Sequence, residues 1–312
     1  MDIFTKEQVA APEAFEKVLH GSVIASITLY DQLAGLPRSD EFAEAILLRF
    51  KDGRAAFKAT YRNRFGDFDQ RTCELIKAHL ECGACVVHDM GVSDARTAVD
   101  FYRTIQRHGV DADYYASDLG NQLLVVRDGC RLLVLDGDGK PLELVWPPFV
   151  LRLIQRESYR FNFLKQAAWV WANYVLVPRM LALHAAGRFQ TMYSITLVCE
   201  AARRLAEQDT RFHLLKHNIL DKWPLPAAAH VIRAMNILNP SYFSTKELQT
   251  AIARIGESLQ EGGLFITGSN QEAQTLVHGG VYQKTANAFK RLWTSGDGSP
   301  FHAEITRTVL FP

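Results

Sequence analysis

The sequence predicts an α/β fold in which a mostly parallel sheet ends in an antiparallel hairpin. A helical region precedes this sheet, and an α+β insertion interrupts it. Three observations predict the fold: residues 84–119 read as strand–helix–strand, strand and helix patterns alternate again after residue 192, and the C-terminal runs 279–296 and 299–311 are β-like. With 312 residues, the chain can form one large domain or two modest ones.

The first 80 residues are expected to be mostly helical. Apolar residues recur at helical spacing over 13–36 and 39–53, and a third helix is expected over 68–83. Ser39 and Asp40 are suitable caps for the second of these helices, and Gly53 is a suitable end.

The strand–helix–strand unit starts with the short apolar run 84–90. A helix is expected over 95–109 because Val99, Tyr102 and Ile105 have helical spacing, and Gly109 closes it. Residues 111–119 follow as a second strand. The unit is long enough for two parallel strands joined by a helix in a right-handed crossover, which is the arrangement we expect.

Residues 121–192 are interpreted as an insertion. Three short strands over 123–146 are separated by the turns RDGC and DGDGK, and helices are expected over about 149–187. The apolar segment 166–187 contains Asn173, Pro178 and Arg179, so its uninterrupted runs are too short for a membrane span.

The alternating pattern then resumes and predicts the rest of the main domain. Strands are expected over 211–220, 230–238 and 264–270, and a helix over 245–263. The last two β-like runs are expected to form a hairpin around the turn SGDGS. The predicted organisation is a helical N-terminal region over 1–80 and a domain over 81–312 that carries a cap insertion at about 121–192.

Composition excludes several classes of protein. Hydrophobic residues make up 48% and charged residues 22%, and the formal net charge is +1. A buried core is therefore expected, whereas a nucleic-acid partner is not. Five cysteines and the absence of an apolar leader predict a reduced, cytoplasmic protein. Cys82 and Cys85 are interpreted as small residues leading into a strand, and no metal site is expected.

The stretch DMGVSDA after the first strand carries the main functional signal. Residues 84–312 resemble the class I S-adenosylmethionine-dependent methyltransferases, whose loop after the first strand reads D/E-x-G-x-G-x-G. The residues at the matching positions are Asp89, Gly91, Ser93 and Ala95. The resemblance implies a Rossmann-like methyltransferase sheet, the cofactor S-adenosyl-L-methionine and the product S-adenosyl-L-homocysteine. It also implies that Asp118, at the end of the second strand, binds the ribose hydroxyls. Small residues replace two glycines, which suits a cofactor without a pyrophosphate.

Further positions follow from the same resemblance. Asn218 would meet the adenine amino group, Ile219 would pack on the ring, and the helix N-terminus near Ala95 would receive the carboxylate of the cofactor. The cofactor-binding residues implied are Asp89, Gly91, Ser93, Asp94, Thr97, Asp118, Leu119, Asn218, Ile219, Arg233 and Asn236.

Catalytic and acceptor-binding residues are less clearly marked. His88, His217, His230, Tyr242 and Asp94 can each move a proton, but none stands out as a base. The insertion is rich in aromatic residues, which suits an apolar or aromatic acceptor. Trp171, Tyr174 and Tyr242 are the expected acceptor-binding residues. The aromatic residues of the insertion are equally well explained as part of its own core or as a dimer contact.

The favoured function is methyl transfer from S-adenosylmethionine to an O or N atom of a small molecule. The expected partner of the protein is this small-molecule acceptor, and a homodimer formed through the N-terminal region or the insertion is an open alternative. Neither a nucleic-acid partner nor a membrane span is expected. A non-catalytic cofactor-binding protein is the second hypothesis. An NAD-dependent oxidoreductase is the third, although Ser93 and Arg96 occupy the later glycine positions of its motif.

Overall fold

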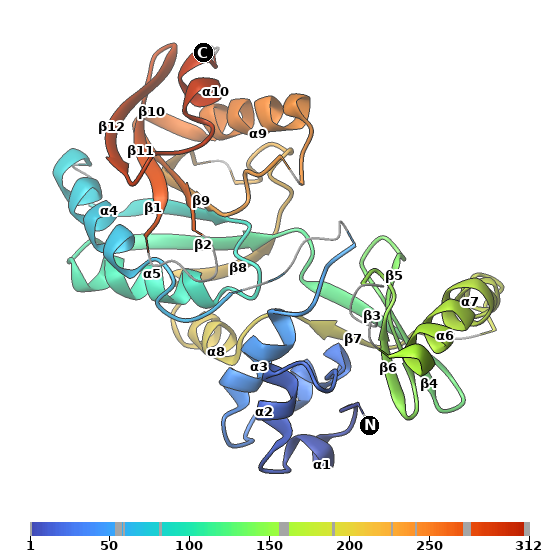
Figure 1. Cartoon of the computed structure of the whole chain (residues 1–312). Helices are drawn as coiled ribbons and strands as arrows, with labels where there is room; N and C mark the ends of the chain where they lie inside the picture. Colours follow the sequence, from blue (N-terminus) through green and yellow to red (C-terminus); the bar gives the residue numbers. More distant parts are fainter. Residues whose placement is uncertain are drawn as a thin grey trace. The chain divides into compact units, whose positions relative to one another are not determined.

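The structure is a computed structural model that describes residues 2–53, 58, 60–80, 83–155, 162–188, 191–225, 227–240, 242–270 and 276–308. The chain forms two compact units, each built from two separate stretches of sequence. The first unit contains residues 1–60 and 120–197, and the second contains residues 61–119 and 198–312. Figure 1 shows the elements of both units.

The second unit is built on a seven-stranded sheet with the order β12-β11-β10-β9-β1-β2-β8. The five strands from β8 to β10 are parallel, and β11 is antiparallel to both of its neighbours. The sheet therefore has the mostly parallel form, with an antiparallel hairpin at one edge, that the sequence predicted. Its strands are β1 (Cys85–Met90), β2 (Ala112–Asp118), β8 (Phe212–Lys216), β9 (Ala229–Met235), β10 (Leu259–Ser269), β11 (His278–Thr285) and β12 (Ala288–Ser295).

Helices cover this sheet on both faces, as Figure 1 shows. One apolar core joins α4, α5 and α8 to one face, and a second core joins α9 and α10 to the other. The two faces of β1 divide between these cores: Val87 belongs to the first core, and Met90, on the other face, belongs to the second. The helices are α4 (Gly66–His79), α5 (Arg96–Arg107), α8 (Glu200–Gln208), α9 (Thr245–Ser258) and α10 (His302–Arg307).

The C-terminal hairpin is present, but its position differs from the prediction. Both strands come from the run 279–296, and they turn at residues 286–287. The expected second strand, 299–311, instead contains α10 over its described part, where Ile305 is fully buried against α9 and the sheet. The turn SGDGS follows the hairpin and does not form it.

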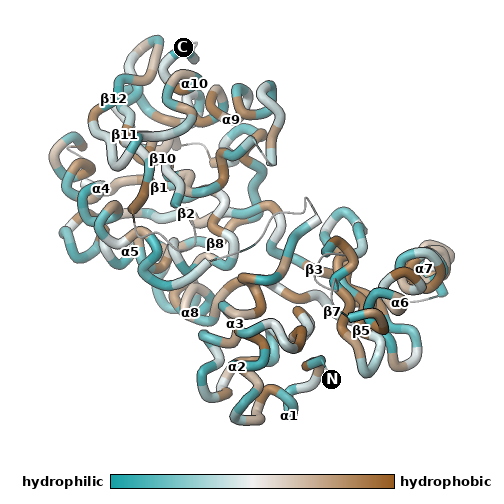
Figure 2. Tube along the Cα trace, viewed as in Figure 1, coloured by the Kyte–Doolittle hydropathy of each residue, from teal (hydrophilic) through white to brown (hydrophobic). Residues whose placement is uncertain are grey.

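The first unit has a five-stranded antiparallel sheet with the order β6-β5-β4-β3-β7. Alternate residues face two different cores: Val125 packs with the N-terminal helices, and Val126 packs with α6 and α7. Figure 2 shows these strands as hydrophobic segments. The strands are β3 (Gln122–Asp128), β4 (Arg131–Leu135), β5 (Pro141–Trp146), β6 (Phe149–Arg152) and β7 (Thr191–Thr196).

The N-terminal region and the insertion fold together, so the division of the chain differs from the predicted one. Ser26 Oγ donates to Glu143 Oε1 of β5 over 2.5 Å, and Glu143 pairs with Arg152 at 3.2 Å. All three residues are buried. Residues 61–80 belong instead to the second unit, where α4 packs on the large sheet.

The N-terminal helices are shorter than predicted. Residues 13–36 were expected to form one helix, but they form α2 and the short helix η1, because the chain turns at Gly21 with φ +70°. The helices of this unit are α1 (Lys6–Val9), α2 (Ala14–Leu19), η1 (Ile27–Gln32), α3 (Ser39–Leu47), α6 (Phe163–Trp171), η3 (Ala172–Leu176) and α7 (Val177–Ala185). A strand, β6, occupies 149–152, where a helix was expected.

The apolar segment 166–187 forms one nearly continuous helical rod through α6, η3 and α7. In the parts of the chain that the structure describes, no helix combines the length and apolarity needed to cross a bilayer. Cys85, at the start of β1, is disulfide-bonded, whereas Cys73, Cys130 and Cys199 are free. The disulfide contradicts the expectation of a fully reduced chain, and Cys82 lies outside the described residues.

Candidate functional site

The loop after β1 is held by unusual backbone conformations. Gly91, Ser93 and Ala95 have φ values of +69°, +55° and +63°, in the left-handed region that favours glycine. The N–H groups of Gly91 and Val92 both donate to the carbonyl of Ser117 on β2, at 2.8 and 3.1 Å. A Cβ atom on Gly91 would lie 2.3 Å from Ile237 Cδ1, so close packing as well as φ requires glycine there.

Replacing Gly91 by alanine is expected to destabilise the second unit by about 2–4 kcal/mol. About 1 kcal/mol comes from the left-handed conformation and the rest from contact with Ile237. Gly109 is a matched control, because it has φ +71° and nothing within 4 Å of an added Cβ. Urea unfolding of G91A, G109A and G91A/I237A checks this. Equal losses for the two single variants would contradict a close-packing role.

The loop meets Asp118 at the end of β2. The Ser93 N–H donates to Asp118 Oδ2 over 2.8 Å, which joins two residues that the sequence assigned to one cofactor site. Ser93 Oγ is buried and has no hydrogen-bond partner among the described residues. Leu119, next to Asp118, keeps 39% of its surface exposed. A carboxylate, an unsatisfied hydroxyl and an exposed apolar side chain therefore lie at this edge of the sheet.

The N-terminus of α5 is already satisfied by the chain itself. Asp94 Oδ1 accepts from the Arg96 N–H at 3.2 Å, and its Oδ2 pairs with the Arg96 guanidinium at 3.1 Å. Both side chains are buried, as is Thr97. The expectation that this helix end receives a carboxylate of the cofactor stays a prediction, and the Asp94 carboxylate already caps one of its N–H groups.

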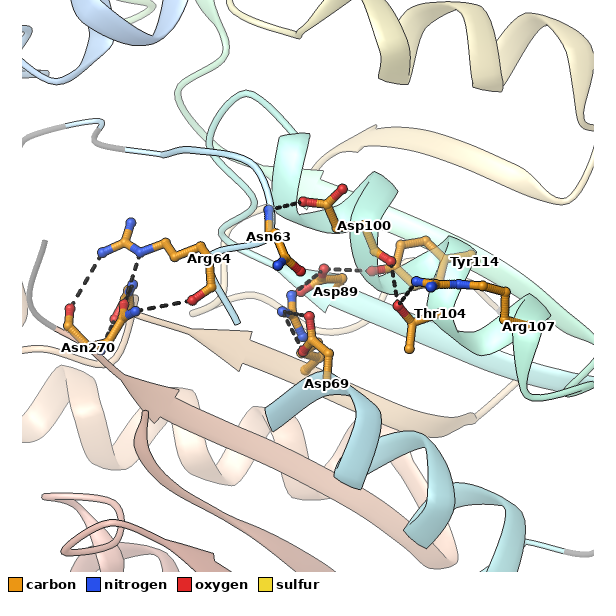
Figure 3. Close-up of polar contacts among 11 residues, drawn as sticks. Asn63, Arg64, Asp69, Asp89, Asp100, Thr104, Arg107, Tyr114 and Asn270 are labelled. Atoms are coloured by element: carbon orange, nitrogen blue, oxygen red, sulfur yellow. Dashed lines mark hydrogen bonds and ion pairs between the residues drawn. The ribbon is translucent and has the colours of Figure 1, made fainter. Parts of the chain in front are cut away.

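Asp89 and Arg233 lie in a buried ionic network and do not face the strand ends. Arg233 Nη1 donates to Asp89 Oδ2 at 2.8 Å, and Arg233 Nη2 donates to Asp69 Oδ1 at 3.0 Å. Tyr114 O–H donates to the same Asp89 oxygen at 2.6 Å. Figure 3 labels Asp69, Asp89 and Tyr114 of this network. The predicted cofactor contacts of Asp89 and Arg233 stay predictions, and in the structure the two buried side chains pair with each other inside the core.

This network holds two carboxyl groups and one guanidinium away from water. Burial raises the pKa of Asp69 to about 7 against the opposing effect of Arg233, and burial likewise raises the pKa of Asp89. The Arg233 guanidinium lies 4.5 Å above the ring of Phe101. Asp69 and Tyr114 were not singled out from the sequence. The available signal was an acid on the apolar face of α4, beside Phe68 and Cys73.

The ends of β9 and β10 are joined by two asparagines. Asn236, with φ +58°, donates from Nδ2 to Asn270 Oδ1 at 3.3 Å, and the Asn270 N–H donates to Asn236 Oδ1 at 3.1 Å. Arg64 Nε also donates to Asn270 Oδ1 at 2.9 Å (Figure 3). Asn236 therefore lies at the strand edge as predicted, while Arg64 and Asn270 were not expected there.

Asn218 and Ile219 follow β8, where the sequence placed them. Asn218 Oδ1 accepts from the Leu220 N–H at 3.2 Å and retains a second lone pair. Ile219 is 5% exposed and belongs to the α9-side core. The proposed contact of Asn218 with adenine stays a prediction, and packing of Ile219 on the ring would have to use the small exposed part of its side chain.

Two buried histidines form a separate cluster with the half-buried Trp223. His88 Nε2 lies 2.7 Å from Ser117 Oγ, and its ring centroid is 3.9 Å from that of Trp223 and 5.2 Å from that of His217. His88 Nδ1 and His217 Nε2 are buried without hydrogen-bond partners among the described residues. Burial lowers the pKa of both histidines, so both are neutral at pH 7.

None of the candidate bases is marked out by the structure. His230 Nδ1 accepts from the Val86 N–H at 3.0 Å, and Asp94 is paired with Arg96. Tyr242 is half-buried after β9. Trp171 and Tyr174 lie in the first unit, where 51% and 76% of their surfaces are exposed.

Comparison with known proteins adds fold-level similarity. No family model and no curated protein matches the chain. Solved structures do match it, all at low similarity. The polyketide synthase CMeT domain for citrinin has 14% identity and a TM-score of 0.33, over 84% of this chain and 46% of that one. CalS10, an amino pentose methyltransferase from Micromonospora echinaspora, has 11% identity and a TM-score of 0.32, over 74% of this chain and 75% of that one.

The glycopeptide N-methyltransferase MtfA matches at 11% identity and a TM-score of 0.29, over 64% of this chain and 53% of that one. This chain thus spans about half the length of the first structures it matches. Similarity at this level assigns no activity to the chain, but the strand order and directions of its own sheet define the fold. The fold is a Rossmann-like α/β sheet that is mostly parallel and ends in an antiparallel C-terminal hairpin. In this sheet, Ser93, Asp118, Asn218 and Asn236 lie at the carboxyl ends of the parallel strands, where open α/β sheets bind ligands.

Proposed function

We propose that the protein is an S-adenosylmethionine-dependent methyltransferase that acts on an O or N atom of a small, apolar or aromatic molecule. The observation that carries this proposal is the contact between the Ser93 N–H and Asp118 Oδ2. It joins the loop after β1 to the acid at the end of β2, which is the pair that would hold the ribose of a nucleoside.

The groups at this edge suit a nucleoside that lacks phosphates. Asp118 supplies negative charge, which favours hydroxyl donors and disfavours a pyrophosphate. Arg96 is buried against Asp94 in the first turn of α5, where a dinucleotide loop requires glycine for close approach. The unsatisfied Ser93 Oγ is a polar atom that a bound molecule can satisfy.

The roles of the chain's own residues follow from these positions. Asp118 would accept hydrogen bonds from the ribose hydroxyls, and Asn218 Oδ1 would accept one from the adenine amino group. When bound, the cofactor supplies an electrophilic methyl group. Holding the acceptor in line with that group can provide much of the rate, so a dedicated base is not required for every acceptor. Tyr242, after β9, is proposed to contact the acceptor.

Calorimetry separates this proposal from the two other hypotheses. Binding of S-adenosylmethionine and S-adenosylhomocysteine, with no heat from NAD, is the expected result. Binding of NAD alone would overturn the proposal. Binding of the demethylated product without methyl transfer to any member of a small-molecule acceptor library would favour the non-catalytic hypothesis. Identification of a small molecule that copurifies with the protein would narrow the acceptor class.

Replacing Asp118 by asparagine is expected to weaken binding of S-adenosylhomocysteine by about 10–100-fold. The change removes the negative charge of the acceptor, and hydrogen bonds to a charged group contribute about 1.5–3 kcal/mol each. The amide oxygen of the asparagine can still accept from the Ser93 N–H. Asp113→Asn, earlier on the same strand, is the control and is expected to leave the affinity unchanged. An unchanged Kd for D118N, measured by calorimetry, would show that Asp118 does not hold the ribose.

A further inference from the structure

The helical rod of the first unit has an exposed aromatic face. We define this aromatic helix face by six residues, which are 39–82% exposed: Phe163, Leu164, Val170, Trp171, Tyr174 and Val175. They recur at intervals of seven and four residues, so they lie along one side of α6 and η3. They account for most of the large hydrophobic side chains that are exposed in the described part of the chain.

The opposite side of the same rod is used by the unit's own core. Ala168, Ala172, Leu176 and Met180 are at most 9% exposed and pack on the five-stranded sheet. Because this second side already anchors the rod, the aromatic helix face is not required for the fold of the unit. The helix is thus apolar on two sides, which is typical of a helix with a partner on each of them.

A local feature of the backbone shapes this face. Pro178 has no N–H and cannot continue the hydrogen-bond ladder of an α-helix. The five residues before α7 form a π-helix, η3, and Asn173 Nδ2 donates to the carbonyl of Trp169 at 3.1 Å. The wider turn accommodates the proline and keeps Trp171 and Tyr174 on the exposed side.

The exposed area has the size of a protein–protein interface. The exposed fractions of the six residues correspond to about 700–800 Å² of mostly apolar surface, against about 800 Å² per partner in a standard interface. The largest apolar patch on a typical monomer is only about 300–600 Å².

The charges on this helix distinguish between possible occupants. A helix that lies on a membrane carries many lysines and arginines beside its apolar face. The described residues 162–188 hold a single lysine, Lys165, which pairs with Asp2 at 2.6 Å, and two arginines, Arg179 and Arg188. The face itself carries no charge, so two copies can meet across a two-fold axis without opposing like charges. We propose that the aromatic helix face is a self-association surface, through which two copies of this chain form an isologous dimer.

The dimer is tested by sedimentation of the full chain over about 1–100 μM, with the Trp171→Lys/Tyr174→Lys double variant beside it. Wild type is expected to reach twice the 35.1 kDa of the chain. The double variant places four lysines at the two-fold interface and is expected to weaken association at least about tenfold. Leu276→Lys, at a site that is 53% exposed, controls for an added charge and is expected to associate as wild type.

Each alternative result would overturn the proposal. A wild-type monomer over the whole range would exclude a stable dimer, and a dimer that survives in the double variant would have another interface. Sedimentation of wild type with vesicles of mixed neutral and anionic lipid, lost in the double variant, would identify the face as a membrane surface. None of these outcomes depends on cofactor binding, so they test the dimer independently of the proposed activity.

Discussion

Replacing Arg233 by methionine is expected to lower the free energy of unfolding of the second unit by about 3–5 kcal/mol. Among the described residues, Arg233 is the cation that forms ion pairs with both Asp69 and Asp89, and the change removes it. Both aspartates are buried. Two carboxyl groups would then lie in the core without a counter-charge. Thermal and urea unfolding followed by near-ultraviolet circular dichroism measure the loss.

The loss caused by Arg233→Met should depend on pH. Without the guanidinium, the folded-state pKa values of Asp69 and Asp89 rise further above their unfolded values. When a carboxyl group has a higher pKa in the folded state than in the unfolded state, its contribution to stability is fully present below the unfolded-state pKa of about 4. That contribution is lost as the pH rises through the folded-state pKa. The variant should therefore lose more stability at pH 8 than at pH 5.

Arg71 provides the matched control, because it forms an ion pair with Glu74 in which both side chains are about half exposed. Arg71→Met is expected to cost less than about 1 kcal/mol at any of these pH values. If Arg233→Met costs no more than Arg71→Met, the network does not stabilise the unit.

Acidification below pH 6.5 is expected to destabilise the second unit through His88 and His217. Burial lowers the pKa of both groups, so the folded state resists protonation while the unfolded state accepts it. Each histidine therefore contributes nothing above its unfolded pKa and costs about 1.4 kcal/mol per pH unit below it, until its folded pKa is reached.

Asp69 opposes this trend, because its raised pKa makes the folded state bind a proton between about pH 4 and 7. The test is therefore a difference between variants at each pH. Relative to wild type, His88→Gln and His217→Gln should become more stable as pH falls from 7 to 5. His20→Gln, at a histidine whose side chain is 75% exposed, should follow wild type. Parallel curves for all three variants would show that the buried pair does not couple folding to protons.

The large sheet was largely predictable because its elements have strong local patterns. The apolar run 84–90, the helical spacing over 95–109 and the strand 230–238 all formed close to their predicted bounds. The C-terminal hairpin was shifted, since Phe301 and Ile305 belong to a core formed with α9 and one face of the sheet and are not paired in a further strand. A sequence pattern indicates that a residue is buried, but not which element buries it.

The candidate site divides in the same way. Ser93 and Asp118 could be paired from the sequence, because loops after parallel strands meet at one edge of the sheet. The ion pairs of Asp89, Asp94 and Arg233 could not be predicted, because an acid looks the same in the sequence whether or not it pairs with a buried arginine. Asp69 and Arg233 are far apart in the chain, and only folding brings them to 3.0 Å.

The sequence by itself determined the strand–helix–strand unit over 84–119, the loop that follows its first strand and the acid at the end of β2, because each depends on residues close together in the chain. The tertiary structure decided that the N-terminal helices join the insertion, that Arg233 is locked between Asp69 and Asp89, and that the aromatic helix face points outward. The physical reason is common to all three: burial and charge pairing depend on which distant segments pack together, and that is decided when the cores form.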